Sequence, residues 1–149
     1  MKLSIFAGMA AGALVPAGPQ AAMAQEKEPM KPAEWVEVSG IKVDDGYGLK
    51  YEKHLATIWR KSQDFALSKG WITGYEVLVN SDPREGEPDV YLLTRFTKWA
   101  SPDEEKQRAA AFREFMKQTD EQMAAASADR AEYRHLGGQM LLRHMVWND

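Results

Sequence analysis

Alternating or β-branched stretches occur four times after residue 34 and predict four β-strands. Residues 35–43 (WVEVSGIKV) are rich in β-branched side chains, and residues 71–80 (WITGYEVLVN) alternate between apolar and polar positions. Residues 89–98 (DVYLLTRFTK) and 139–147 (QMLLRHMVW) alternate as well. The polar loop 81–88 is short and rich in proline, so we expect the second and third strands to form a hairpin.

Two other stretches repeat their apolar residues in steps of three and four, which is typical of amphipathic helices. The first is predicted over residues 49–69 and is closed by Gly70, a residue that easily adopts positive φ past a helix end. The second begins with the capping box Ser101-Pro102-Asp103-Glu104 and is predicted to run to about Arg130. Its inner stripe is expected to contain Phe112, Met116, Thr119 and Met123.

The resulting order is strand, helix, strand, strand, helix, strand, which is the ferredoxin-like βαββαβ pattern of the α+β class. Such a fold has a four-stranded antiparallel sheet with two helices on one face. The last predicted strand carries large apolar groups on both faces, for example Met140 and Leu142 on one and Leu141 and Met145 on the other. We therefore expect a second copy of the chain to cover the second face, which makes a homodimer.

Residues 1–24 have the layout of a secretory signal peptide. Lys2 precedes an apolar stretch from Leu3 to Val15, and Ala22-Met23-Ala24 supplies the small residues of a cleavage site. The apolar stretch has 13 residues, whereas a membrane span needs roughly 20. We expect cleavage and not an uncleaved anchor. The mature protein would be periplasmic or secreted and would have no membrane anchor.

Beyond this segment, residues 25–34 are rich in proline and charge and are expected to form a disordered leader before a folded domain over residues 35–149. Loss of Lys2 with the signal peptide changes the formal net charge from −3 to −4. A basic face for nucleic acid is therefore not expected. The chain has no cysteine, which excludes disulfides and thiolate chemistry. Its three histidines lack metal-site spacing, so no metal is expected.

The block from Tyr51 to Val77 reads YEKHLATIWRKSQDFALSKGWITGYEV, an aromatic helix followed by glycine and an I-x-G-Y-type strand. With the element order, this block resembles the dimeric α+β barrel superfamily over about residues 35–147. That superfamily includes stress-responsive (Dabb-type), NIPSNAP-like and EthD-like proteins and antibiotic-biosynthesis monooxygenases. The resemblance implies a dimeric barrel with a pocket between helices and sheet. Fold alone does not assign a reaction within it.

Aromatic side chains with polar tips gather on the predicted helix and hairpin, and they suit a small apolar ligand held by a few hydrogen bonds. The alternative is a plain aromatic core. Arg95 would either bind a carboxylate of the ligand or form an ion pair between sheets or at the dimer interface, with Glu37 or Glu76 as its acidic partner. The ligand-binding candidates are Tyr51, Trp59, Tyr75, Tyr91 and Arg95.

The resemblance also leaves an enzyme open, because cofactor-independent monooxygenases of the superfamily use Trp, Tyr, Asn and His in their pocket. The catalytic candidates in this chain are then His144, Trp59, Tyr51 and Tyr91. The asparagines fall at predicted element ends, and His144 is equally suited to the core or to an interface. A haem-handling relative would need a histidine late in the second helix, where only His135 follows nearby. No cofactor is expected.

Overall fold

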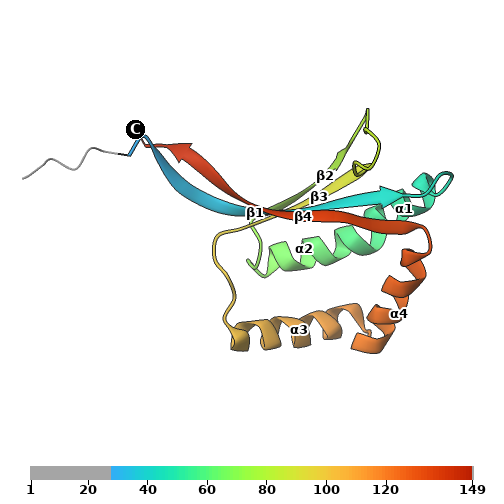
Figure 1. Cartoon of the computed structure of the whole chain (residues 1–149). Helices are drawn as coiled ribbons and strands as arrows, with labels where there is room; N and C mark the ends of the chain where they lie inside the picture. Colours follow the sequence, from blue (N-terminus) through green and yellow to red (C-terminus); the bar gives the residue numbers. More distant parts are fainter. Residues whose placement is uncertain (1–27, 149) are drawn as a thin grey trace, which may run out of the picture.

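The computed structural model describes residues 28–148, which form an α+β fold around a four-stranded antiparallel sheet of order β2-β3-β1-β4. The strands are β1 (Met30–Val43), β2 (Gly74–Val79), β3 (Val90–Phe96) and β4 (Arg134–Trp147). All the helices lie on one side of the sheet (Figure 1). The predicted ferredoxin-like fold and its β2–β3 hairpin are therefore confirmed. The predicted signal peptide, residues 1–24, lies outside the described residues.

The first helix packs directly on the sheet, as its apolar stripe predicts. It is continuous through α1 (Gly48–His54), a π-helical segment (Leu55–Trp59) and α2 (Arg60–Ser68). Tyr51 and Leu55 form a buried cluster with Ile41 of β1 and Tyr133 before β4. Gly70 adopts φ +66° just past the end, which confirms the predicted stop. The π-helical segment was not predicted. This segment widens one turn of the helix at its end, where the Trp59 side chain points towards β2.

The second predicted helix is not continuous, and its extension to Arg130 in one piece is wrong. It consists of α3 (Pro102–Met116) and α4 (Asp120–Ala131), with Lys117 between them in the left-handed region at φ 54°. Thr119 does not lie on an inner stripe but caps α4, because its hydroxyl accepts the Gln122 N–H at 3.3 Å. The reciprocal bond from Thr119 N–H to the Gln122 side chain completes a second capping box.

The predicted capping box at the start of α3 is confirmed. Ser101 accepts the Glu104 N–H, and the Glu104 carboxylate accepts the Ser101 N–H at 2.8 Å. That backbone bond and the neighbouring Lys98 lower the pKa of Glu104 to about 2. The α3 start is thereby fixed by local sequence alone.

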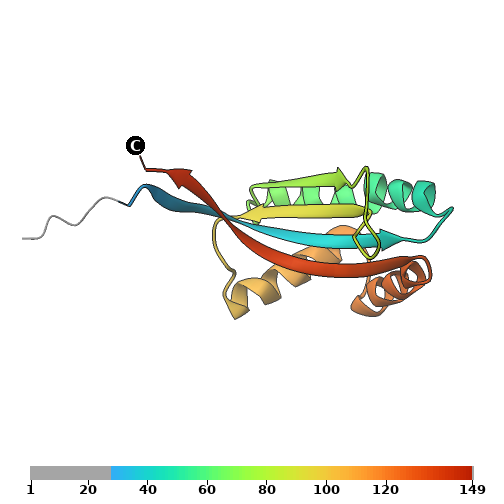
Figure 2. The ribbon, with the colours of Figure 1, turned by 45° about the horizontal axis from the view of Figure 1, so that its top comes forward.

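The helices α3 and α4 form an outer layer that is farther from the sheet than α2 (Figure 1). They lie on the β4 side, whereas α1 and α2 lie behind β2 and β3 (Figure 2). The contact between the layers is aromatic: the Phe65 ring of α2 stacks on Phe115 at 4.1 Å and meets Phe112 at 6.2 Å between ring centroids. No residue of α3 or α4, both fully described, is buried.

Strands β1 and β4 are longer than predicted and extend beyond the other two as a two-stranded arm (Figure 2). Met30 pairs with Trp147, so residues 30–34 of the predicted leader belong to the sheet. Proline has no backbone N–H to donate to a neighbouring strand. Pro32 is accommodated because the register shifts between Pro32 and Trp35, where the regular hydrogen bonding is interrupted. At the other end, β4 begins before the predicted bend at Gly137-Gly138 and crosses it through a second register shift.

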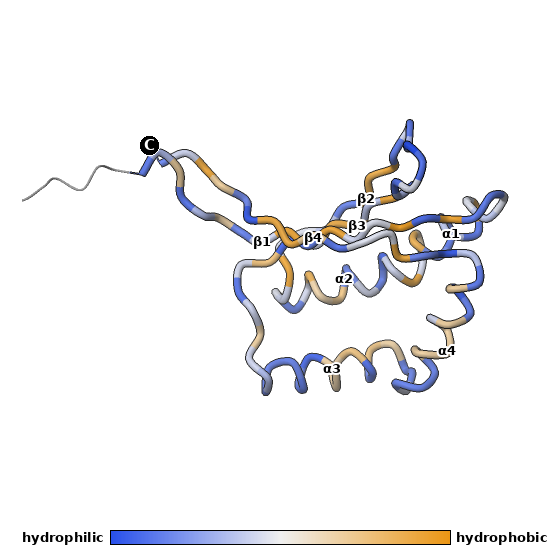
Figure 3. Tube along the Cα trace, viewed as in Figure 1, coloured by the Kyte–Doolittle hydropathy of each residue, from blue (hydrophilic) through white to orange (hydrophobic). Residues whose placement is uncertain are grey.

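The register defines the face of the sheet opposite the helices, here called the open face. Its centre holds the buried side chains of Val36, Val38 and Leu93. Leu78, Met140 and Leu142 surround them and are about half exposed. Figure 3 shows these apolar stretches of neighbouring strands side by side in the sheet. The prediction that β4 carries apolar groups on both faces is confirmed, because Leu141 lies on the helix face.

Candidate ligand-binding groove

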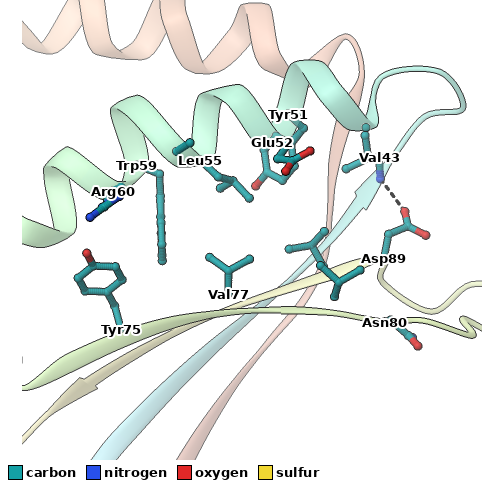
Figure 4. Close-up of a pocket in the computed structure, with 14 residues that line it drawn as sticks. Val43, Tyr51, Glu52, Leu55, Trp59, Arg60, Tyr75, Val77, Asn80 and Asp89 are labelled. Atoms are coloured by element: carbon teal, nitrogen blue, oxygen red, sulfur yellow. Dashed lines mark hydrogen bonds between the residues drawn. The ribbon is translucent and has the colours of Figure 1, made fainter.

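A groove of about 680 Å³ lies between the first helix and β2, and we call it the helix–β2 groove (Figure 4). Figure 4 shows Trp59 reaching from the helix towards β2, with Tyr75 and Val77 pointing back towards the helix. Its lining residues are Val43, Gly48, Tyr51, Glu52, Leu55, Ala56, Trp59, Arg60, Tyr75, Val77, Val79, Asn80, Asp89 and Val90.

The groove exists because small side chains face each other across its middle. Strand β2 presents only Val77 and Val79 to this side between Tyr75 and its end, and the helix presents Ala56 and Gly48. Leu55 also lines the groove, but most of its side chain packs in the buried cluster beside Ile41. Helix and strand are thus held apart by packing over β1 and β3, and the space over β2 stays unfilled.

Polar groups gather at the two ends of the groove. At one end the Tyr75 hydroxyl donates a short hydrogen bond to Asp64, and the Arg60 guanidinium lies 3.7 Å from the same carboxylate. The hydrogen bond to Asp64 raises the pKa of Tyr75. At the other end Asp89 accepts the Val43 backbone N–H at 2.8 Å, the dashed line in Figure 4. The middle of the groove therefore suits an apolar body, and its ends supply a few polar atoms.

Two aromatic residues of the first helix form the inner wall. Tyr51 is only 3% exposed, and burial raises the pKa of its hydroxyl. The Trp59 ring meets the Tyr75 ring edge-on, with 5.4 Å between centroids. These rings are fixed by packing and present flat apolar surfaces to the groove.

The structure brings three of the predicted site residues together and separates the other three from them. Tyr51, Trp59 and Tyr75 line the helix–β2 groove. Tyr91 packs on the cluster of Val36, Val38 and Leu93, so it belongs to the open face. Arg95 and His144 share that open face, because both point away from the helices in the strand register. The four catalytic candidates therefore do not meet within one chain.

Arg95 pairs with Glu76, one of the two acidic partners considered for it, on the neighbouring strand of the same sheet. Its Nη2 lies 3.1 Å from Glu76 Oε1 and its Nη1 lies 3.8 Å from Glu34 Oε1. His144 Nδ1 approaches the same Glu34 oxygen at 3.9 Å, and the Thr73 hydroxyl donates to the other Glu34 oxygen at 2.6 Å. The open face thus carries a linked group of charges at one end of its apolar centre.

The pattern of the sequence did not identify several groove residues, among them Ala56, Asn80 and Asp89. Asp89 was placed at the start of the third strand, but its bond to Val43 joins two segments far apart in sequence. His135 lies in β4 and not in a connection, and its Nε2 is 2.9 Å from Asp44. Within residues 28–148 no group of three His, Cys, Asp or Glu side chains is arranged to hold a metal ion.

No helix within residues 28–148 combines the length and the apolar character that crossing a membrane requires. No protein-family model matches the chain, and no curated protein matches it. Among solved structures, the crystal structure of HapK from Hahella chejuensis is similar, with a TM-score of 0.47 and 11% sequence identity. The alignment covers 74% of this chain and 91% of that one. The resemblance to the dimeric α+β barrel families stays a prediction.

Proposed function

We propose that this protein is an exported homodimer that binds a small apolar ligand in the helix–β2 groove. The observation that carries this proposal is the groove itself, with its apolar middle, the Tyr51 and Trp59 rings along its inner wall and polar groups at its ends. Its volume of about 680 Å³ lies within the range of roughly 300–1,000 Å³ typical of small-molecule sites. The mature protein would work in the periplasm or outside the cell without a cofactor, nucleic acid or membrane anchor.

The ligand expected from this lining is uncharged. Most of the described lining residues are valine, alanine, leucine and aromatic residues, and Arg60 at one end is already beside Asp64. Asp89 at the other end is engaged by the Val43 backbone. An anionic ligand would lose hydration without gaining a free cation among the described lining residues, which costs several kcal/mol.

The homodimer is supported by the open face. Leu78, Met140 and Leu142 are about half exposed around a buried centre, and a matching face on a second copy would remove them from water. Within one chain Arg95 already pairs with Glu76 and Glu34. These charged side chains can therefore be buried in an interface without a further partner.

The enzymatic alternative, a cofactor-independent monooxygenase or a haem-handling protein, would use His144 beside Tyr51 and Trp59. His144 lies across the sheet from both, on the open face. The geometry therefore supports ligand binding better than either reaction.

The groove is tested with a neutral apolar fluorophore such as N-phenyl-1-naphthylamine. We expect its emission to rise on binding to the mature protein and the rise to be lost in Val77→Trp, which fills the groove. Leu67→Trp adds the same ring on the exposed side of α2 and should bind the probe like the wild type. Equal binding by both variants would contradict the groove as the site.

The homodimer is tested by analytical ultracentrifugation of the mature chain. We expect a dimer at micromolar concentration and a monomer for Leu142→Glu, which places a charge in the open face. Leu67→Glu, on α2, is the matched control and should remain a dimer. A monomeric wild type would reject the homodimer and leave the groove proposal standing.

A further inference from the structure

A second cavity of about 370 Å³ lies between the first helix and the outer helices, and we call it the Arg130 cleft. Its wall is apolar on both sides: Ile58 and Trp59 come from the first helix, and Phe112, Met116 and Met123 come from α3 and α4. The lining also includes the polar side chains of His54, Ser62, Gln118 and Arg130. The cleft is thus amphiphilic, and Arg130 is the one charged side chain among the described residues that line it.

That charge has no counter-ion within the described chain. Arg130 is the single charged side chain among the described lining residues, and no carboxylate lines the cleft. Neither Arg130 nor Arg134 takes part in any ion pair of residues 28–148. The Nε of Arg134 is moreover buried without a hydrogen-bond partner among these residues. An arginine fork without an acidic partner is a ready site for a carboxylate.

His54 adds a hydrogen-bonding group without adding charge. Burial, together with the charges of Arg130 and Arg134, lowers its pKa to about 4, so its imidazole is neutral at pH 7. Its ring also stacks on Tyr51 with 6.0 Å between centroids, which fixes its orientation at the cleft edge. A neutral imidazole donates one hydrogen bond, which a carboxylate oxygen accepts.

We propose that the Arg130 cleft is a second ligand site, which binds an amphiphilic carboxylate such as a medium-chain fatty acid. The carboxylate would pair with the Arg130 guanidinium beside His54, and the hydrocarbon chain would lie between the aromatic and methionine side chains of the two helical layers. Methionine side chains adapt to an irregular chain, and this favours an alkyl ligand over a rigid ring.

The Arg130 cleft and the helix–β2 groove are different sites that share one residue. Trp59 lines both, and no other residue of the described chain does. The two sites also select different chemistry, because the groove lining includes the carboxylates of Glu52 and Asp89, whereas Arg130 is the single charged residue among the described residues that line the cleft. The cleft proposal therefore does not depend on the groove proposal.

The first experiment is calorimetric titration of the mature protein with octanoate, decanoate and decanol below their aggregation limits. We expect decanoate to bind more tightly than octanoate by about fourfold for each added methylene, the value for burial of one CH₂. Decanol has the same chain without the charge and should bind at least tenfold more weakly than decanoate. Equal affinities for decanoate and decanol, or no binding of decanoate, would overturn the proposal.

The second experiment assigns the carboxylate to the cleft by substitution. Arg130→Gln should weaken decanoate binding by about tenfold to a hundredfold, as expected for the loss of a charge-assisted bond. Arg84→Gln removes the same charge from an exposed loop and should leave the affinity unchanged. An unchanged affinity in Arg130→Gln would overturn the proposal even if decanoate binds.

A pair of filling variants separates the two cavities. Ala126→Trp blocks the Arg130 cleft and should abolish decanoate binding, whereas Val77→Trp blocks the helix–β2 groove and should not. The reverse result would place the carboxylate in the groove and overturn the proposal. Because Ala126→Trp also perturbs α4, its circular dichroism is compared with the wild type, and Arg130→Gln gives the independent answer.

Discussion

The two helical layers of this protein are both amphipathic, but only the first is part of the core. The first helix places Tyr51 and Leu55 among Ile41 and the β3 valine and leucine side chains, where they are buried. The helices α3 and α4 meet α2 mainly through Phe65 and bury no residue of their own. The difference teaches that residues of an apolar stripe become fully buried where a flat, branched sheet surface faces them, as Tyr51 and Leu55 are, and not where helix faces helix.

This difference also explains why both cavities border the first helix. On its β2 side the sheet presents small valines, and on its outer side two short helices cover it with flexible methionines. Trp59, in the π-helical segment, is exposed to both spaces. A well-packed inner layer with a loosely packed outer layer is an arrangement suited to ligand binding.

The largest expected effect comes from truncating one residue in each layer. Ile41 is 1% exposed, so Ile41→Ala should lower the free energy of unfolding by about 4 kcal/mol. Met123→Ala, in the half-buried wall between α2 and α4, should cost no more than about 1 kcal/mol, because solvent already reaches it. Urea denaturation of both variants measures the difference. Similar costs would show that the outer layer is packed as tightly as the inner one.

Much of the fold was predictable because its signals are local. The alternation of residues 89–98 and the capping box at Ser101 were sufficient to place β3 and the start of α3. The break at Lys117 was missed because alanine-rich stretches on both sides favour helix, although Thr119 and Gln122 form a readable capping box. The arm was missed because its strand pairing of Met30 with Trp147 is long-range and has no local signature.

The candidate site was predictable in part for a similar reason. Alternation places Tyr75 with Val77 and separates Tyr91 and Arg95 from Val90, but it does not say which side of the sheet the helices cover. In the structure the helices cover the side of the sheet that carries Tyr75. The unpaired charge of Arg130 was not predictable, because it depends on which carboxylates stay out of reach in three dimensions.

The next effect concerns a threonine hydroxyl in each layer, one at the N-terminus of α4 and one inside the first helix. Thr119→Ala removes the N-cap of α4 and should cost about 1 kcal/mol. Thr57→Ala in the first helix is the matched control, because its hydroxyl donates only to carbonyls of the preceding turn, those of Lys53 and His54. We expect Thr57→Ala to change stability by less than about 0.5 kcal/mol. Thermal unfolding of both variants measures this, and a neutral Thr119→Ala would mean that α4 does not depend on its cap.

The first helix and α3 also differ in the residue that follows the C-terminal end of each helix. The first helix ends at Gly70 with φ +66°, whereas α3 ends at Lys117 with φ 54°. A lysine in this region is strained, so Lys117→Gly should stabilise the protein by about 0.5–1 kcal/mol, and Gly70→Lys should destabilise it by about as much. Parallel urea titrations measure both signs. Destabilisation by Lys117→Gly would indicate that the lysine side chain contributes more than its backbone strain costs.

The smallest expected effect is a pH dependence that originates between the layers. His54 has its pKa lowered from 6.5 to about 4, first by burial and then by Arg130 and Arg134, while Tyr51 stacks beside it. The unfolded chain therefore binds a proton at this site between pH 6.5 and 4 that the folded chain does not, and stability falls as the pH decreases through that window. Because His54 is only half-buried and solvent screens its charge, the loss should stay below about 1 kcal/mol.

His54→Gln should remove this part of the pH slope in urea titrations, and Arg130→Gln should reduce it only partly, because burial is the larger cause. If NMR titration of His54 in the folded protein gave a pKa near 6.5, burial would not lower it, and this contribution to the pH dependence of stability would be absent.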